Sequence, residues 1–142
     1  GELQPIELET DTHPGFMTDW QQPFVAMLTQ ASGISVIHET IYEDRFGYVK
    51  DLNSLGANIK VFSKCLGELP CRFNSMGYHH SAVISGATPL VGNKLVVRDL
   101  RSGMLNLIAA LIARGESIIE GVEEIIFGAP ARPVKRPGVG VT

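Results

Sequence analysis

Near the start of the chain, a carboxylate lies beside residues that would hold it in one position. Asp19 follows Thr18, and the pair comes shortly after Pro14 and Gly15, which together are typical of a tight turn. A carboxylate fixed in this way could accept a proton from a bound substrate, as a general base does. The alternative is structural, because Asp is also a common N-cap of helices. The sequence leaves both interpretations of Asp19 open.

Two further groups of charged residues have the composition of an anion-binding site. Arg45 follows a predicted strand, within segment 39–46, and ligands of α/β proteins collect at strand ends. Arg101 comes after Asp99 in the first turn of a predicted helix, where a cation opposes the helix dipole unless it pairs with a carboxylate or a ligand. For both arginines, the structural alternative is an ion pair within the protein.

The cysteines and histidines lack the spacing of a common metal site. Cys65 and Cys71 are separated by five residues and are followed by His79 and His80. Paired zinc ligands usually follow C-x2-4-C and H-x3-5-H patterns instead. We therefore expect no metal site and two reduced, partly buried thiols, with a disulfide between the cysteines as the alternative.

Length and composition are those of one ordinary globular unit. The chain has 142 residues, of which 44% are hydrophobic and 19% charged, and a net charge of −3. This charge gives no reason to expect a nucleic acid or an anionic membrane as a partner. The longest apolar run, 104–113, contains Asn106 and is shorter than the about 20 residues of a membrane span. Because the chain begins with Gly rather than Met, we expect a piece of a longer protein.

The hydrophobic pattern predicts alternating helices and strands. Helices are expected over 19–31, 48–55 and 100–114, strands over 34–41, 59–63, 81–84, 94–97 and 117–120, and an irregular loop over 66–80. Helices between strands imply βαβ units. The last helix is apolar on most faces, so we expect it to be packed between other elements. In a chain that lacks part of its domain, we expect it to expose an apolar patch.

Two blocks of the chain resemble each other. In 19–41 and in 99–120, a helix with Asp at its predicted N-cap is followed by Gly and then by a strand. This similarity indicates an internal repeat.

Taken together, the three charged segments resemble one enzyme family. The runs His-Pro-Gly-Phe-Met-Thr-Asp-Trp-Gln (13–21), Glu-Thr-Ile-Tyr-Glu-Asp-Arg-Phe (39–46) and Asp-Leu-Arg (99–101) are similar to those of the UDP-N-acetylglucosamine 1-carboxyvinyltransferases, which are enolpyruvyl transferases. The resemblance covers residues 2–122, only part of the length of a family member. It implies an α/β fold, an inside-out α/β barrel built from βαβαββ repeats, of which this chain holds a part.

The resemblance also implies a reaction. The intact protein is expected to transfer the enolpyruvyl group of phosphoenolpyruvate to the 3-hydroxyl of UDP-N-acetylglucosamine, at the start of peptidoglycan synthesis in the cytoplasm. It implies no cofactor and no metal, and its partners are the two substrates and the remainder of the same enzyme.

Roles for individual residues follow from the same resemblance. Asp19 matches the family aspartate that contacts the sugar 3-hydroxyl and takes its proton, and Thr18 is expected to fix its orientation. Ile41 matches a position whose backbone touches the UDP-sugar. Three further charges match family charges near the cleft and are expected to support them: Arg45, Asp99 and Arg101.

The chain departs from the family pattern in several places. Met17 stands where the family usually has Pro, and Asp44 where it usually has Asn. After Gly121 the family's Asp-Arg-Gly-Tyr-Glu motif, whose Arg helps to hold phosphoenolpyruvate, is missing, and 123–142 is expected to be a divergent, flexible tail. The family's Lys–Asn pair and mobile loop also have no counterpart here. The isolated chain is therefore expected to be inactive.

Two other hypotheses stay open. One is a related enolpyruvyl transferase acting on shikimate 3-phosphate, which shares the fold and the reaction type. The other is a non-catalytic fragment or paralogue that keeps the fold and binds a nucleotide sugar.

Overall fold

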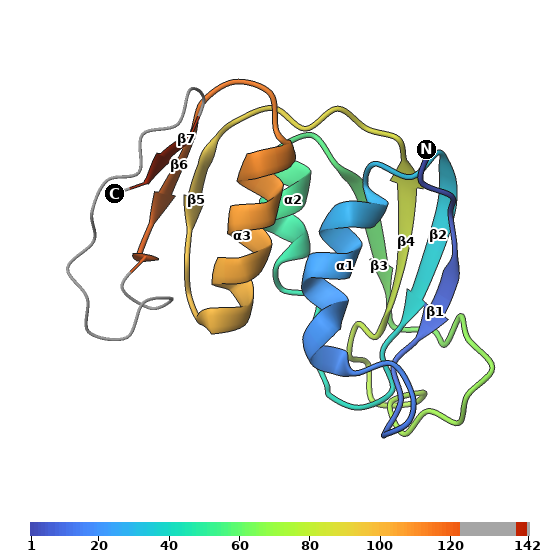
Figure 1. Cartoon of the computed structure of the whole chain (residues 1–142). Helices are drawn as coiled ribbons and strands as arrows, with labels where there is room; N and C mark the ends of the chain where they lie inside the picture. The colour runs from blue at the N-terminus through green and yellow to red at the C-terminus, as the bar shows by residue number, and fades with distance from the viewer. Residues whose placement is uncertain (123–138, 142) are drawn as a thin grey trace.

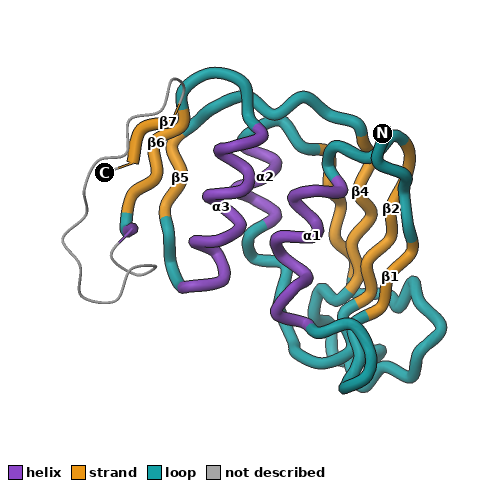
Figure 2. Tube along the Cα trace, viewed as in Figure 1, coloured by secondary structure: helices purple, strands orange, loops and turns teal. Residues whose placement is uncertain are grey.

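In the described part of the chain, three α-helices lie between two β-sheets (Figure 1). The computed structural model describes residues 1–122 and the backbone of 139–141. Along the chain the elements are β1 (Glu7–Glu9), the 3-10 helix η1 (Thr18–Trp20), α1 (Gln21–Leu28), β2 (Gly33–His38), α2 (Val49–Ser54), β3 (Asn58–Phe62), β4 (Ser81–Gly86), β5 (Lys94–Val96), α3 (Leu100–Ile112), β6 (Ser117–Glu120) and β7 (Val139–Val141). With helices inside and sheets outside, the arrangement is that of an inside-out α/β domain (Figure 2).

The two sheets differ in their strand directions. The four-stranded sheet has the order β1-β2-β4-β3, in which β1 and β2 are parallel and β4 runs antiparallel to both of its neighbours. The three-stranded sheet has the order β5-β6-β7 and is parallel throughout. Each parallel pair that encloses a helix, β1-α1-β2 and β5-α3-β6, is a βαβ unit.

The element order confirms the predicted repeat. From β1 to β4 the chain reads βαβαββ, with η1 leading into α1, and β5-α3-β6 begins the same pattern again. Two strands were missed by the sequence analysis. The first, β1, has only three residues, and β7 lies in the segment for which no element was predicted. The predicted flexibility of the tail falls largely on 123–138 and 142, which lie outside the described residues.

The first helix begins differently from the prediction. Met17 and Trp20 are the N-cap residues of η1 and α1, and neither helix has a side-chain cap hydrogen bond. The predicted capping role of Asp19 is therefore wrong. The polar side chains next to this position, Thr18 and Gln21, are instead hydrogen-bonded to Glu39. These side chains satisfy the buried carboxylate of Glu39 rather than the backbone N–H groups at the start of the helix.

The capping prediction for α3 is confirmed. The Ser102 backbone N–H donates to the Asp99 carboxylate at 2.8 Å, and the Asp99 N–H donates to the Ser102 hydroxyl at 3.0 Å. This reciprocal pair is a capping box. Because it fixes the first turn of α3, it also fixes the backbone that carries Arg101.

The core is continuous from one sheet to the other. Its fully buried side chains come from both sheets, from all three helices and from the connecting loops, and the largest aliphatic ones are Ile37, Leu52, Leu55, Ile84, Leu90, Leu95, Leu105 and Ile119. The helices are thus held by apolar contacts on both sides. Among the described residues, no helix is long and apolar enough to cross a membrane.

One face of α3 is left uncovered by the described part of the chain. Leu100, Met104 and Leu111 are 51%, 44% and 56% exposed. Near the start of the helix, these side chains continue into a hollow of about 500 Å³ that Trp20 and Pro23 also line. Exposed apolar side chains that recur along one helix face are typical of a surface covered by another part of a protein.

We expect this face to make the isolated chain self-associate. Leu111→Lys should lower the molecular mass measured by light scattering, while the free energy of unfolding changes by no more than about 0.5 kcal/mol because the side chain is exposed. Val91→Lys is the matched control, since Val91 is 59% exposed but lies in the loop between β4 and β5. Equal effects of the two substitutions would contradict an association through α3.

Candidate functional site

The centre of the candidate site is a buried carboxylate. Glu39 directly follows β2, is 0% exposed, and accepts hydrogen bonds on both of its oxygens. Oε2 accepts from the Thr18 hydroxyl at 2.9 Å and from the Gln21 amide at 2.6 Å. Oε1 accepts from the backbone N–H groups of Ile41 and Tyr42 at 2.9 and 3.1 Å. Four donors thereby compensate the loss of water around a buried carboxylate.

A buried tyrosine extends this network toward α2. The Tyr48 hydroxyl donates to the Gln21 side-chain oxygen at 2.9 Å, while the amide group of Gln21 donates to Glu39. Burial and the nearby charge of Glu39 raise the pKa of Tyr48 well above its ordinary value. The hydroxyl therefore stays protonated and remains a donor. Through Gln21, the start of α1 is held to both β2 and α2.

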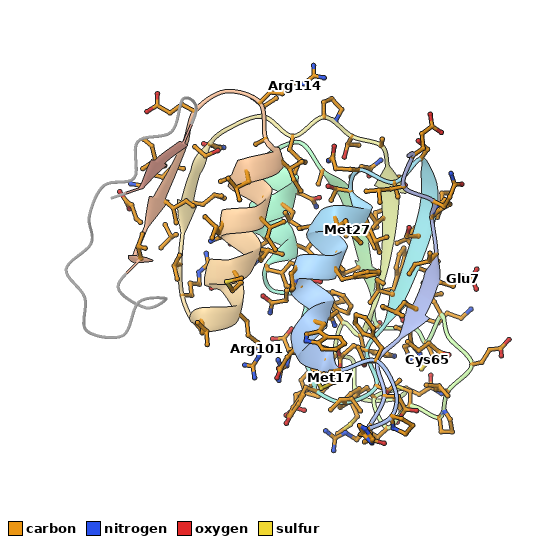
Figure 3. All side chains as sticks on the ribbon, viewed as in Figure 1. Glu7, Met17, Met27, Cys65, Arg101 and Arg114 are labelled. Carbon is orange, nitrogen blue, oxygen red and sulfur yellow. The ribbon has the colours of Figure 1, made fainter. Side chains whose placement is uncertain are left out.

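The three charged segments meet at Asp19. Its Oδ1 accepts a hydrogen bond from Arg101 Nε at 2.7 Å and lies 3.8 Å from Arg45 Nη1. Arg101 lies in the first turn of α3, at the lower end of that helix in Figure 3. Arg45 is mostly buried and its guanidinium stacks over the Tyr42 ring at 4.2 Å. Asp19 itself remains 58% exposed, so it is oriented by two cations yet open to a ligand.

A cavity of about 400 Å³ adjoins these charges. It lies between the β2–α2 loop and the N-terminus of α3, and its lining is Gln22, Glu43, Asp44, Arg45, Gly47, Tyr48, Arg98, Asp99, Arg101 and Ser102. Asp99 and Arg101 also line the neighbouring hollow beside Asp19 and Trp20. Guanidinium groups beside a helix N-terminus favour an anionic ligand such as a phosphate.

The predicted site residues lie in one region, with two differences from the prediction. The Thr18 hydroxyl contacts Glu39 rather than Asp19, so it holds the turn that carries the carboxylate. The Ile41 carbonyl accepts a hydrogen bond from Arg72 at 2.6 Å, and its N–H is bound by Glu39. For Arg45 and Arg101, the predicted ion pairs within the protein are present, and both are to Asp19.

Sequence reasoning missed the residues that hold the site together. The sequence predicts no role for Glu39, although this residue opens the segment 39–46, and none for Gln21 or Tyr48. One signal was available, since a carboxylate directly after a β-branched strand must either be exposed or be paired. Arg72 gave no signal, because it lies in a loop whose path the sequence does not determine.

The arrangement is suited to proton abstraction next to a bound anion. Asp19 offers an oriented carboxylate at the edge of two hollows, and two arginines and a helix N-terminus lie within the same region. A carboxylate in hydrogen-bond reach of a substrate hydroxyl can act as its base. The surrounding cations can stabilise negative charge on a phosphate or a developing oxyanion.

Comparison with known proteins finds similar sequences over most of this chain. Residues 2–131 match the family model described as EPSP synthase (3-phosphoshikimate 1-carboxyvinyltransferase). Proteins named UDP-N-acetylglucosamine 1-carboxyvinyltransferase are 58% identical in Protochlamydia amoebophila (over 87% of this chain and 26% of that protein) and 53% identical in Chlamydia trachomatis serovar D (87% and 28%). The protein named UDP-N-acetylglucosamine 1-carboxyvinyltransferase 2 of Bacillus subtilis is 38% identical over 99% of this chain and 29% of its own length.

Solved structures show the same fold. The enolpyruvyl transferase NikO from Streptomyces tendae superposes with a TM-score of 0.68 at 23% identity, over 89% of this chain and 26% of that protein. EPSP synthase from Acinetobacter baumannii superposes with a TM-score of 0.53 at 19% identity, over 81% and 23%. The chain therefore spans about a quarter of the length of the relatives that it matches.

We expect Glu39→Gln to destabilise the fold although it preserves the shape of the side chain. The amide nitrogen would face two hydrogen-bond donors, and the free energy of unfolding in urea should fall by about 2–3 kcal/mol. Glu43→Gln is the control, because Glu43 is exposed and lies 3.7 Å from the exposed Arg72, so its change should stay within about 0.5 kcal/mol. A loss at Glu39 no larger than the loss at Glu43 would contradict the role of the buried carboxylate.

Proposed function

Because this chain belongs to the EPSP synthase family of enolpyruvyl transferases, we propose that its parent protein transfers the enolpyruvyl group of phosphoenolpyruvate to the 3-hydroxyl of UDP-N-acetylglucosamine. Relatives that are 52–58% identical carry this name, and this favours the UDP-sugar over shikimate 3-phosphate as the acceptor. The reaction would supply the first committed intermediate of peptidoglycan, in the cytoplasm.

One observation carries the proposal: the carboxylate of Asp19 is held between Arg101 and Arg45 beside the N-terminus of α3. In the proposed reaction, the 3-hydroxyl oxygen forms a bond to C2 of phosphoenolpyruvate while its proton passes to Asp19. C3 takes up a proton from a group in the remainder of the enzyme, so that C2 becomes tetrahedral. The bond between C2 and the phosphate oxygen then breaks, inorganic phosphate leaves with the bonding electrons, and loss of a proton from C3 restores the double bond. Of these steps, the described residues can perform two: Asp19 can take the 3-hydroxyl proton, and Arg45 and Arg101 can stabilise negative charge on the phosphate.

The supporting residues are proposed to hold Asp19 and the UDP-sugar in position, and they take no part in the proton transfer. Asp99 caps α3 and thereby fixes Arg101, which orients Asp19. Thr18 fixes η1 through Glu39. The backbone of Ile41 is proposed to contact the UDP-sugar, and Glu39 and Arg72 already bind its N–H and its carbonyl from within the protein.

The uncovered face of α3 supports a longer parent protein. The chain spans 26–28% of the length of relatives such as those from Protochlamydia and Chlamydia trachomatis. We propose that the remainder of the same enzyme covers Leu100, Met104 and Leu111 and supplies the groups that bind phosphoenolpyruvate.

Asp19→Asn in the full-length enzyme tests the base directly. If Asp19 takes the proton, kcat should fall by about 10²–10⁴-fold, whereas binding of UDP-N-acetylglucosamine should weaken far less. Asp11→Asn is the control, because Asp11 is exposed and its carboxylate accepts hydrogen bonds from the N–H and the hydroxyl of the neighbouring Thr12, at 2.7 and 3.5 Å, which Asn can also accept. A near-normal rate for Asp19→Asn would remove this residue from the mechanism.

A protein of these 142 residues alone should not catalyse the transfer, because the phosphoenolpyruvate-binding groups of the family are not among them. The measurement is phosphate release from phosphoenolpyruvate in the presence of UDP-N-acetylglucosamine. Release above the rate of a heat-denatured sample would contradict this expectation.

A further inference from the structure

Four metal-ligating side chains converge at one end of the four-stranded sheet, outside the site described above. They are His38 at the end of β2, Cys65 and Cys71 in the loop between β3 and β4, and His80 directly before β4. Their ligand atoms all lie within 4.8 Å of one another. Figure 3 places Cys65 at the lower end of this sheet, and the pairing of His38 with Ser81 brings both histidines to that end.

The first histidine already has the orientation of a metal ligand. His38 is 0% exposed, and its Nδ1 lies 2.7 Å from the Glu9 carboxylate. The same carboxylate oxygen also accepts a hydrogen bond from the Leu69 N–H at 2.9 Å, so it faces the imidazole as an acceptor and Nδ1 is the donor of the pair. With Nδ1 as the donor, the neutral ring presents the lone pair of Nε2, which is buried and has no hydrogen-bond partner among the described residues. Metal-bound histidines typically have such a carboxylate behind them.

The second histidine is held in the same tautomer by a different acceptor. His80 Nδ1 lies 2.8 Å from the Tyr78 carbonyl, which can only accept, so Nδ1 carries the proton. Its Nε2 therefore also presents a lone pair, 3.2 Å from the sulfur of Cys65. The neighbouring His79 is exposed and does not belong to the group.

The sulfur atoms complete a set of four soft and borderline donors. Cys65 and Cys71 are both free thiols and both partly buried. Two thiolates and two neutral imidazoles form the Cys2His2 set that binds Zn²⁺ tetrahedrally. Two thiolates also neutralise the charge of the ion, so a buried complex carries no net charge.

We propose that His38, Cys65, Cys71 and His80 bind a structural zinc ion. Binding forms two Zn–S and two Zn–N bonds and releases the two thiol protons to solvent. All four positions are taken by protein side chains, so none is left for a substrate, as in structural rather than catalytic zinc sites. The ligand spacing in the sequence does not predict this site, because only Cys65 to His80 lie near one another in the chain and His38 comes from β2.

The zinc ion would fix the loop between β3 and β4. Gly67 of this loop packs on the Glu9–His38 pair so closely that a Cβ at this position would overlap both side chains. The same loop carries Arg72, which binds the Ile41 carbonyl. The zinc site would thus also hold the segment after β2, a consequence for catalysis that rests on the proposed function, whereas zinc binding itself does not.

Zinc content and cobalt spectra of the purified full chain test the proposal. Under reducing conditions the chain should bind one equivalent of Zn²⁺, measured by mass spectrometry of the metal and by competition with a chelator. Co²⁺ in its place should show the absorption of a tetrahedral ion and thiolate-to-cobalt charge transfer. Cys65→Ser and Cys71→Ser should each weaken or abolish the charge transfer, and His79→Asn should leave it unchanged. Circular dichroism establishes that each variant is folded.

A second pair of variants tests zinc binding without changing any of the four proposed ligands. Glu9→Gln should weaken zinc binding by about 10–100-fold, as changes behind a ligating histidine do. Glu7→Gln, an exposed carboxylate on the same strand, should have no effect. A folded, reduced chain without stoichiometric zinc binding, a cobalt spectrum without thiolate character, or a Cys65–Cys71 disulfide that persists in reductant would each overturn the proposal.

Discussion

The site depends on the burial of one carboxylate. An ionised Glu39 without water would cost several kcal/mol unless its oxygens were fully hydrogen-bonded. The fold meets this requirement with donors from Thr18 in η1, from Gln21 at the start of α1, and from two N–H groups after β2. These three segments therefore cannot move independently. The position of Asp19, one residue after Thr18, follows from this constraint.

The inside-out arrangement brings the second half of the site to the first. Because the helices lie between the sheets, α1 and α3 pack against each other. The N-terminus of α3 then lies beside η1, and Arg101 reaches a carboxylate that is 82 positions away in the sequence. An exposed ion pair of this kind contributes little to stability, so its value lies in orienting Asp19.

The local patterns in the sequence predicted much of this fold. The βαβ units and the Asp99 cap follow from the periodicity of apolar residues and from cap preferences, and the structure has both. The expectation that Arg101 pairs with a carboxylate or a ligand followed from its place in the first turn of a helix, and the structure pairs it with Asp19. The prediction of Asp19 as an N-cap was wrong. Glu39, which is distant in the sequence, binds the neighbouring side chains of Thr18 and Gln21 and so determines how the helix begins. Local propensity cannot anticipate such a partner.

The same limit explains what the sequence could not show at all. A three-residue strand such as β1 carries too few residues for a periodic signal. The convergence of His38 with Cys65 depends on the pairing of β2 with β4 and on the path of a long loop. The strand pairing and the loop path belong to the tertiary structure, and local sequence patterns do not determine them.

The central claim is that the buried Glu39 holds Asp19 where a sugar hydroxyl can reach it. The most direct measurement is a crystal structure of the full-length enzyme with UDP-N-acetylglucosamine bound. We expect the Asp19 carboxylate to lie within hydrogen-bond distance of the 3-hydroxyl, about 2.6–3.2 Å, with Glu39 still bound to Thr18 and Gln21. A bound sugar whose 3-hydroxyl lies away from Asp19, or a Glu39 released from these partners, would contradict the account.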